Sequence, residues 1–455
     1  MSSILISGAT IVTMNPRREI LVGGEVLITE NRIAAIGKVD PTIVPTDAER
    51  VDARGLTMMP GLVNSHVHTS QQLGRGVADD VDLLTWLRDR IWPFEAALLP
   101  EDQLISTLAI GAEMIRTGVT TFSEAGGQHI DAMGQAISTL GLRATICRSS
   151  MDAGVGLPDG WIRPTEAVME QQLDEHQRWH GAKNGRIRHW FGLRTIFNCS
   201  DELILRTAEA AERLDTSIQI HVAEIPEENR FAEETRGATT VEHLAKLGVM
   251  GPRLLGVHCV WLTPREIALF AEHAMPAVHC PSANMRVLGF APIPQLLAAG
   301  VPVGIGTDSP PCCNRGDIFD EIYLAALIHK GRHGDPTLMP APSLLDMATL
   351  HGAACLRWSD EIGSLDVGKK ADLVLLDLRE IGTLPIHDLV SSLVYATHSR
   401  AVLSTMCDGR WLMRDRKLLV VDEVALLAEI QARGHAIRVR AGISLPERYP
   451  MLDFR

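Results

Sequence analysis

Short apolar runs alternate with amphipathic stretches through most of the chain, from about residue 58 to residue 361. The apolar runs indicate strands, whereas residues 102–116, 202–212 and 264–273 repeat apolar side chains at the spacing of an amphipathic helix. Strands that alternate with helices are typical of βα units around a parallel sheet. The length of this region suits an α/β fold of the TIM type, a (β/α)8 barrel of about 250 residues with insertions.

The two ends of the chain show a different pattern, with short β-rich stretches separated by turns. Such stretches occupy residues 1–57 and return from residue 362 onward, for example at 372–377 and 402–407. We therefore expect two domains. One is a composite β domain built from residues 1–57 plus 362–455, with a helical tail at the C terminus. The other is the catalytic barrel at residues 58–361.

Two histidines one residue apart, His66 and His68, follow the apolar run at 56–64 and provide the first candidate chemistry. Side chains at i and i+2 of an extended strand point the same way, so both imidazoles converge at the end of the strand. That arrangement indicates a metal site. Taken alone, a His-x-His pair on a surface strand is usually just polar, so the prediction depends on what other strands supply.

Three later strands also end in residues that can bind a metal or move a proton. These are His221 after the run 217–220, with Glu224 three residues on, His258 after the run 254–257, and Asp308 after 301–307. Barrel enzymes of the α/β type carry their chemistry at the carboxyl ends of the strands. Each residue alone could be a hydrogen-bonded core histidine or an aspartate in a turn or cap. Four such motifs in chain order predict one shared site.

The combined set predicts a catalytic metal centre. His66, His68 and His221 offer imidazole nitrogens and Asp308 offers a carboxylate oxygen, a set suited to Zn²⁺ or Fe²⁺ with one position left for water. Such an ion lowers the pKa of its bound water to about 7. Glu224 lies where it could take a proton from that water and pass it to a leaving amine. We expect one divalent metal ion per chain, zinc or, as the alternative, ferrous iron.

Longer segments of the chain resemble a known family. They are the start at 4–9, the segment 60–68 with both histidines, the segments 75–80 and 279–285, and the closing stretch 362–373. On these segments the chain is identified as a member of the amidohydrolase superfamily, in the branch that holds cytosine, guanine and S-adenosylhomocysteine deaminases and the s-triazine hydrolases. The likeness extends over nearly the whole length.

The resemblance implies that the two chain ends fold together into one small β-sandwich that flanks the barrel. It also implies roles for the site residues: Glu224 transfers protons, His258 polarises the electrophile, and Asp308 holds the metal and accepts a proton from the water. Two-metal members of the superfamily bridge their ions with a carboxylated lysine on strand 4. The corresponding segment 187–194 contains no lysine, so a single metal is expected.

Five residues are candidate substrate contacts: Gln72, Trp86, Trp92, Arg194 and His279. The two tryptophans lie in the loop after strand 1, where flat aromatic walls would suit a heteroaromatic ring; packing between helices is the alternative. The resembling S-adenosylhomocysteine deaminases carry His-Ala-Pro-Tyr after strand 4, whereas this chain has Arg-Thr-Ile-Phe at 194–197. The departure leaves room for a pterin, a free base or a triazine as substrate.

Several other residues have two interpretations. Glu124 is either an acceptor for a ring N–H or a solvated loop residue, and Arg75 is either a substrate ligand or a salt-bridge partner. His279 either reaches the rim of the pocket or packs in the core. The adjacent thiols Cys312 and Cys313 either face the substrate or belong to a tight proline-rich loop. None of the eight cysteines forms a Cys-x-x-Cys pair, so no structural zinc site is indicated.

Composition excludes several classes of partner. The 455 residues are 46% hydrophobic and 22% charged, as in an ordinary globular protein, and the formal net charge of -13 opposes binding to nucleic acid. The N-terminus has no basic region and no long apolar core typical of a signal peptide, and no apolar run approaches the roughly 20 residues of a membrane span. We expect a cytoplasmic homodimer or higher homo-oligomer with a small-molecule heteroaromatic substrate and neither nucleic-acid nor membrane partners.

These observations predict a metal-dependent aminohydrolase, or deaminase, that replaces an exocyclic amine on an N-heteroaromatic ring with hydroxyl and releases ammonia. The ring could be of the purine, pterin, pyrimidine or triazine type. A second hypothesis is displacement of chloride or an alkylamine from an s-triazine-like ring, because both reactions need hydroxide attack on an electron-poor C=N carbon. A third is a catalytically silent scaffold, although such proteins usually lose metal ligands and all of them are present here.

Overall fold

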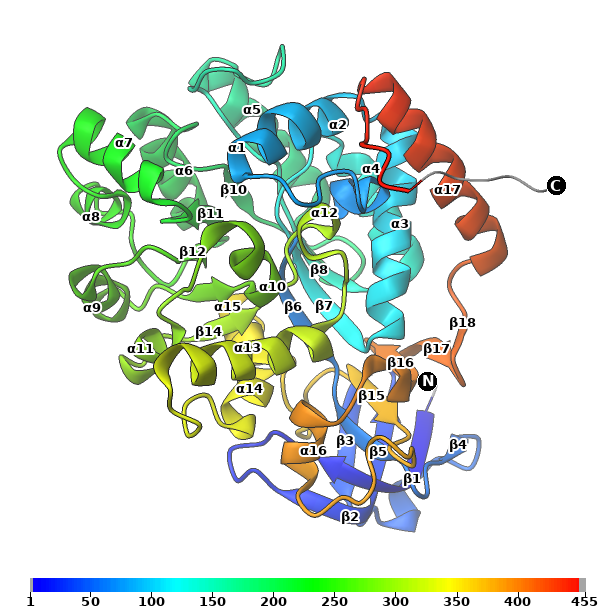
Figure 1. Ribbon diagram of the computed structural model, residues 1–455. Helices are drawn as coiled ribbons and strands as arrows, with labels where there is room; N and C mark the ends of the chain where they lie inside the picture. The colour runs from blue at the N-terminus through cyan, green and yellow to red at the C-terminus, as the bar shows by residue number, and fades with distance from the viewer. Residues whose placement is uncertain (1–2, 450–455) are drawn as a thin grey trace.

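The computed structural model describes residues 3–449, and its larger part is a parallel β-barrel surrounded by helices (Figure 1). The barrel strands are β6 (Leu62–Val67), β7 (Val119–Glu124), β8 (Arg143–Ile146), β9 (Ile187–His189), β10 (Phe191–Leu193), β11 (Ile218–Val222), β12 (Leu254–His258), β13 (Ala277–His279) and β14 (Val303–Ile305). Parallel pairing runs from β6 to β9 and from β10 to β14. The Asp308 N–H donates to the His66 carbonyl (3.0 Å) and joins β14 to β6. Because β9 and β10 are one strand interrupted at Trp190, the eight strands confirm the predicted (β/α)8 barrel.

Helices on the outside of the barrel connect each strand to the next (Figure 1). The three helices predicted from apolar spacing are present as α3 (Pro100–Arg116), α6 (Asp201–Arg213) and α9 (Pro264–Glu272). The hydroxyls of Ser200 and Thr263 cap α6 and α9. α3 begins two residues before the predicted start, at Pro100, because proline fits the first turn of a helix. The other helices of this layer are α4 (Ile130–Leu140), α5 (Thr165–Trp179), α7 (Pro226–Arg236), α8 (Thr240–Lys246), α11 (Ile293–Ala298), α13 (Ile318–His333), α14 (Ala341–Ala348) and α15 (Leu350–Cys355).

Shorter helical elements form the loops at the carboxyl ends of three strands. They are η2 (Thr69–Gly74), α1 (Leu83–Thr85), η3 (Trp86–Ile91) and α2 (Trp92–Ala96) after β6, α10 (Pro281–Ala283) and η4 (Asn284–Leu288) after β13, and α12 (Pro310–Cys313) after β14. A hydrogen bond ties the first of these loops to strand β7: the buried carboxylate of Glu124, at the end of β7, accepts the Thr69 N–H (2.9 Å). The chain directly after the His66–His68 motif is therefore fixed to the neighbouring strand.

The two chain ends build one mixed nine-stranded sheet, which lies below the barrel in Figure 1. Its strands are β1 (Ser3–Val12), β2 (Ile20–Thr29), β3 (Arg32–Gly37), β4 (Glu49–Asp52) and β5 (Thr57–Pro60) from the start, and β15 (Leu373–Leu376), β16 (Val402–Cys407), β17 (Arg410–Arg414) and β18 (Lys417–Leu418) from the end. Three further short helices, η1 (Pro41–Ile43), α16 (Leu389–Tyr395) and η5 (Ser399–Ala401), lie in its connections. One core cluster joins Ile6 and Val26 of the first part to Leu373 and Met406 of the last. The prediction that both ends form one β unit is confirmed.

Strand β5 pairs with β1 and β15, so the terminal sheet continues to Pro60. The division of the chain at residues 57/58 and 361/362 stays a prediction. A buried ion pair connects the two parts: the guanidinium of Arg143, at the start of β8, donates to both carboxylate oxygens of Asp372 (3.0 and 3.1 Å). A charge pair that is desolvated on both sides tolerates little displacement, because separating the partners leaves a buried charge.

The predicted C-terminal helix is α17 (Glu423–Arg440), and it packs beside α3 on the barrel (Figure 1). Two of its arginines, Arg433 and Arg440, donate to the buried carboxylate of Asp102 in α3. Ile437 enters an apolar cluster with Leu73 of η2. The tail therefore supports the same loop that Glu124 anchors.

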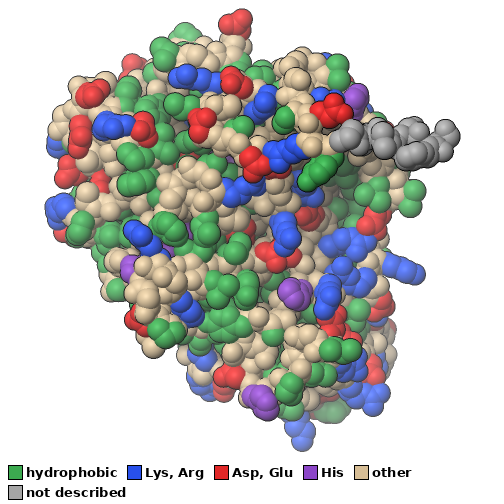
Figure 2. All heavy atoms as spheres, viewed as in Figure 1, with side chains coloured by type: hydrophobic (Ala, Val, Ile, Leu, Met, Phe, Trp, Pro, Cys, Tyr) green, Lys and Arg blue, Asp and Glu red, His purple; other side chains and the backbone are tan. Residues whose placement is uncertain are grey.

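Positive and negative side chains are interspersed over most of the face shown in Figure 2. Between residues 3 and 449 no helix has the length and apolarity needed to cross a membrane. The cytoplasmic location and the homo-oligomeric state stay predictions.

Candidate metal centre

The candidate residues meet at the carboxyl end of the barrel because parallel strands end at the same rim. His66 and His68 lie at the end of β6, His221 is the second-to-last residue of β11, and His258 is the last residue of β12. Asp308 follows β14 by three residues. All five side chains are buried, with 0–7% of their surface exposed. The structure therefore brings these motifs together at one rim, and their role as one functional site stays a prediction.

The ligand atoms of four residues face one another at short distances. Asp308 Oδ1 lies 3.4 Å from His68 Nε2 and 3.6 Å from His66 Nε2. His221 Nε2 lies 3.4 Å from His68 Nε2. Three imidazoles and a carboxylate thus converge on one small volume, and donor atoms of His66, His68 and Asp308 all lie within 4.8 Å of one another.

The environment of these donors fits a bound divalent metal. Neither ring nitrogen of His66 has a hydrogen-bond partner among residues 3–449, although the ring is fully buried. His221 uses Nδ1 for the carbonyl of Arg194 (2.9 Å), which leaves Nε2 directed at the shared volume. Burial lowers the pKa of His66, His68 and His221. Neutral imidazoles are the form that coordinates metal, and an unpaired buried ring is costly unless something binds it.

Asp308 supplies the negative charge of the set. Its burial favours the protonated form, but the ring of His66, 3.6 Å away, and the neighbouring histidines His258 and His68 outweigh that effect and hold the pKa of the carboxyl well below its usual range. The residue also has a left-handed backbone, with φ of +62°, and His258 has φ of +69°. Positive φ is uncommon outside glycine and concentrates at functional positions.

Glu224 and His258 stand beside the four ligand residues. Glu224 Oε1 lies 3.7 Å from His258 Nε2, and burial raises the pKa of Glu224 against the opposing effects of His258 and Arg194. The backbone N–H of Glu224 donates to the carboxylate of Glu228 (2.8 Å), which fixes the turn after β11. A carboxylate with a raised pKa close to an imidazole is suited to exchanging protons near neutral pH.

His258 has a second possible role. One of its nitrogens lies within 4.8 Å of donor atoms of both His66 and His221, so it could also enter the coordination sphere of an ion held there. Its other nitrogen, Nδ1, lies 2.9 Å from Asn284 Oδ1. This contact fixes the ring from behind, and it was not visible in the sequence.

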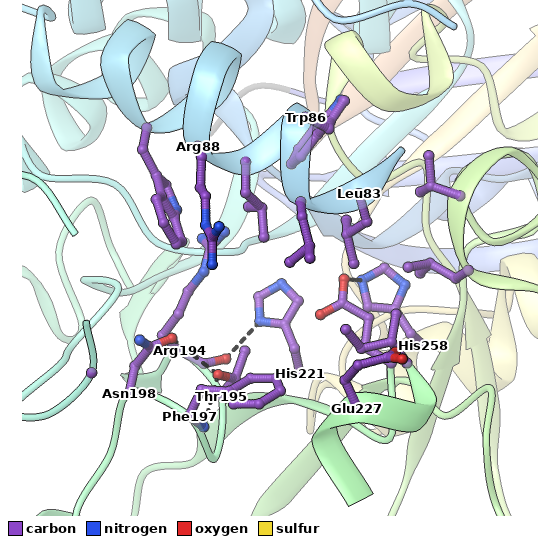
Figure 3. Close-up of a pocket in the computed structure, with 18 of the residues that line it drawn as sticks. Leu83, Trp86, Arg88, Arg194, Thr195, Phe197, Asn198, His221, Glu227 and His258 are labelled. Carbon is purple, nitrogen blue, oxygen red and sulfur yellow. Dashed lines mark hydrogen bonds and ion pairs between the residues drawn. The ribbon is translucent and has the colours of Figure 1, made fainter. Parts of the chain in front are cut away.

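A cavity of about 540 Å³ opens from these residues toward solvent. His68, His221, Glu224, His258 and Asp308 line its inner end. Its walls are mostly apolar and come from the loops after β6, β10 and β13; they include Leu83, Leu87, Trp86, Trp92, Phe197 and Val287. Figure 3 shows the η3 side chains above His221 and His258. The volume is in the range of pockets that enclose small organic molecules.

Three of the five candidate substrate contacts line this cavity: Trp86, Trp92 and Arg194. The other two, Gln72 and His279, are not among its lining residues. Gln72 Nε2 donates to Glu113 Oε2 (3.1 Å). His279 is buried, with Nε2 3.2 Å from His329 Nε2. Both side chains are turned into the protein, so the structure gives neither of them contact with a molecule in the cavity.

The structure also shows the positions of Glu124, Arg75, Cys312 and Cys313, for which the sequence allowed two interpretations. Glu124 is neither solvated nor in the cavity; it anchors η2, and burial raises its pKa to about 7. Arg75 pairs with Glu113, as its salt-bridge interpretation predicts. Cys312 lines the cavity, whereas Cys313 does not. Burial raises the pKa of both thiols, so both stay protonated.

Comparison with known proteins gives a consistent result. A model of the amidohydrolase family matches residues 57–412. A 5'-deoxyadenosine deaminase of Methanosarcina acetivorans is 36% identical over 446 residues, which cover 97% of this chain and all of that one. A 5-methylthioadenosine/S-adenosylhomocysteine deaminase of Moorella thermoacetica is 37% identical over 437 residues, covering 96% of this chain and all of the relative.

Solved structures agree over a similar length. An adenosine deaminase from Xanthomonas campestris with bound zinc superimposes with a TM-score of 0.91 at 32% identity, covering 96% of this chain and 99% of that one. An atrazine chlorohydrolase from Arthrobacter aurescens TC1 complexed with zinc superimposes with a TM-score of 0.86 at 27% identity, covering 95% and 99%.

Proposed function

This chain belongs to the amidohydrolase family. We propose that it deaminates an adenosine derivative with a modified 5' position, which binds in the cavity. The broader class is firm: the chain is a deaminase that hydrolyses an exocyclic C–N bond of a cyclic amidine with release of ammonia. The observation that carries the proposal is the convergence of three imidazoles and Asp308 beside Glu224 at the inner end of the cavity. The deaminase relatives favour an enzyme over a catalytically silent scaffold.

His66, His68, His221 and Asp308 are the proposed ligands of one divalent metal. The zinc-bound structural neighbour supports Zn²⁺, and Fe²⁺ has the same donor preferences. When bound, the ion supplies a hydroxide nucleophile at neutral pH and a Lewis acid. The segment 187–194 contains no lysine that could bridge a second ion.

The chain's own residues then move the protons. Glu224 accepts the proton of the attacking water and delivers it to the exocyclic nitrogen, so that the C–N bond breaks and ammonia leaves. Asp308 is a second acceptor in the same volume. His258, 3.7 Å from Glu224, orients the reacting group and, once it holds a proton on Nε2, stabilises the negative charge that develops on that group. Trp86 and Trp92 are proposed to form the walls of the pocket around the substrate's heteroaromatic ring.

A second candidate is displacement of chloride or an alkylamine from an s-triazine-like ring. The favouring observations are the superposition with the chlorohydrolase and the arginine at position 194, where the resembling nucleoside deaminases carry histidine. The two reactions differ in the group released and share the attack on an electron-poor ring carbon.

Ammonia release across a panel of aminated rings separates the candidates. We expect ammonia from adenosine, 5'-deoxyadenosine and 5'-methylthioadenosine, and at least roughly 100-fold slower release from the same compounds incubated with the Glu224→Gln variant. Chloride or alkylamine release from triazines, with no ammonia from any purine nucleoside, would support the second candidate and contradict the first.

A further inference from the structure

Two arginines on the cavity wall have no ion-pair partner among the residues that the structure describes. Arg194 follows β10, and Arg88 projects from η3 on the opposite side of the cavity. Neither guanidinium makes a hydrogen bond or an ion pair with any residue between 3 and 449 that the structure describes. A third lining arginine, Arg236, behaves differently: it donates to Asp201 (3.0 Å) and to the Ile196 carbonyl (3.0 Å).

Burial raises the pKa of Glu224 and the charge of Arg194 opposes that rise, but no carboxylate of the described residues lies within ion-pair distance of either arginine. Glu224 and Asp308 lie at the metal end, where the mechanism uses them. Glu227 forms an ion pair with Arg230. Figure 3 shows Arg88 and Arg194 extending toward each other from opposite walls. Arg194 is half-buried and Arg88 is exposed. Two like charges that extend toward each other repel, and an anion between them offsets this repulsion.

We propose that Arg194 and Arg88 form a subsite for an anionic oxygen group, a carboxylate or a phosphate, on the part of the substrate remote from the leaving amine. Guanidinium groups present paired N–H donors that match these oxygens, and charge-assisted hydrogen bonds are the strong ones. The proposal rests on the proposed function in one respect, because it requires the leaving amine to lie at the metal end. The backbone of Arg194 holds His221, so its side chain is placed relative to that end.

Matched pairs of neutral and anionic compounds test the subsite. The pairs are adenosine and adenosine 5'-monophosphate, 5'-methylthioadenosine and S-adenosylhomocysteine, and pterin and pterin-6-carboxylate. For each class of ring that the protein deaminates, we compare kcat/KM between the two members of a pair. We expect the anionic member to have the higher value in at least one pair. Arg194→Met should lower that value by about 10- to 100-fold, the effect of one charge-assisted hydrogen bond, and lower kcat/KM for the neutral member by a smaller factor. Arg88→Met should act in the same direction.

Arg90→Met is the matched control, because Arg90 lies on the same element and does not line the cavity. Calorimetry with inosine and inosine 5'-monophosphate, which have no 6-amino group to lose, repeats the comparison without turnover. Lumazine and its 6-carboxylate, the deaminated counterparts of the two pterins, cover the other ring class in the same way. The subsite is overturned if neutral and anionic compounds release ammonia at equal rates and Arg194→Met does not change those rates. The proposed deaminase activity would stand in that case. If no purine nucleoside is deaminated, the proposed substrate class fails, and the calorimetric pairs still decide whether an anion binds.

A separate observation concerns the buried groups behind His258. Asn284 Oδ1 lies 2.9 Å from His258 Nδ1, Asn284 Nδ2 lies 3.4 Å from His279 Nδ1, and His279 Nε2 lies 3.2 Å from His329 Nε2. All four side chains are at most 2% exposed. They form one hydrogen-bonded row that leads away from the cavity.

The direction of the row follows from its donors and acceptors. An amide oxygen only accepts, so His258 carries its proton on Nδ1, and the amide nitrogen only donates, so His279 Nδ1 is unprotonated. Burial lowers the pKa of His279, which keeps that ring neutral with its proton on Nε2, toward His329. The row thus holds one tautomer of His258, with Nε2 facing Glu224.

We infer that Asn284 is a positioning residue that fixes the tautomer and orientation of His258, with His279 and His329 orienting the amide. Asn284→Leu should lower kcat by about 10- to 100-fold, as loss of a partner that orients an active-site histidine typically does, and leave KM within about threefold. Asn284→Asp keeps the acceptor and should retain most of the activity. Nitrogen-15 NMR of the imidazoles should show His258 protonated on Nδ1 in the unsubstituted protein and mixed in Asn284→Leu. A normal kcat in Asn284→Leu, or a fall in kcat accompanied by an unchanged tautomer, overturns the inference.

Discussion

Asp308→Ala is expected to abolish turnover of every substrate and to lower the metal content of the purified protein. Its Oδ1 atom lies 3.4 and 3.6 Å from the Nε2 atoms of His68 and His66, so its removal takes away the only carboxylate of the donor set. Three neutral imidazoles then face one another without the charge that offsets a divalent ion, and metal affinity falls. The unsubstituted protein should carry close to one divalent metal per chain, measured by elemental analysis alongside ammonia release.

The matched control is Asp320→Ala, which removes a carboxylate of α13 that pairs with Arg315 at the surface. It should leave metal content and turnover unchanged. Retention of both metal and activity in Asp308→Ala would remove Asp308 from the ligand set. Two tightly held ions per active chain would contradict the single-metal proposal, which depends on the absence of lysine from the segment 187–194.

The positions of the proposed metal ligands could be predicted from the sequence because a regular element fixes where each side chain points. His66 and His68 share one side of an extended segment, and the apolar runs before His221 and His258 end where β11 and β12 end. Parallel strands of a barrel end at one rim, so strand order alone brings these residues together. The same reasoning identified Glu224, which is tied to His221 by a turn of three residues.

Residues on irregular loops could not be placed in this way. Gln72 lies in η2, whose path is set by Glu124 below it and by α17 behind it, and both come from distant parts of the sequence. No sequence pattern indicated that the helical tail would pack there. Gln72 consequently faces Glu113 instead of the cavity.

His279 shows the limit of the strand argument. It ends β13 as His258 ends β12, yet its ring is enclosed by His329 from α13 and by Asn284 from η4. Position at a strand end determines which rim a residue occupies, whereas the packing of the following helices determines whether the side chain reaches the cavity. Asn284 and Arg88 were missed for the same reason, since each projects from a π-helical segment whose start no local motif marks.

Glu224→Gln separates proton transfer from metal binding, and we expect turnover to fall by at least the roughly 100-fold typical of general acid-base catalysis. The substitution keeps the size of the side chain and removes its capacity to take a proton from water and return it to the amine. The backbone at this position is held by Glu228 through the Glu224 N–H, so the turn after β11 should persist. Metal content should therefore stay near that of the unsubstituted protein, since the four ligands are unchanged.

Glu234→Gln is the control for this experiment, because Glu234 is an exposed glutamate on α7, the helix that follows the same turn. It should alter neither kcat nor metal content. Full activity in Glu224→Gln would remove the residue from proton transfer and transfer that role to Asp308 or His258. Loss of metal together with activity would mean that Glu224 belongs to the coordination shell, which its contact with His258 at 3.7 Å does not require. Only a fall in kcat at constant metal content agrees with a carboxylate whose raised pKa suits it to carry one proton from water to the leaving nitrogen.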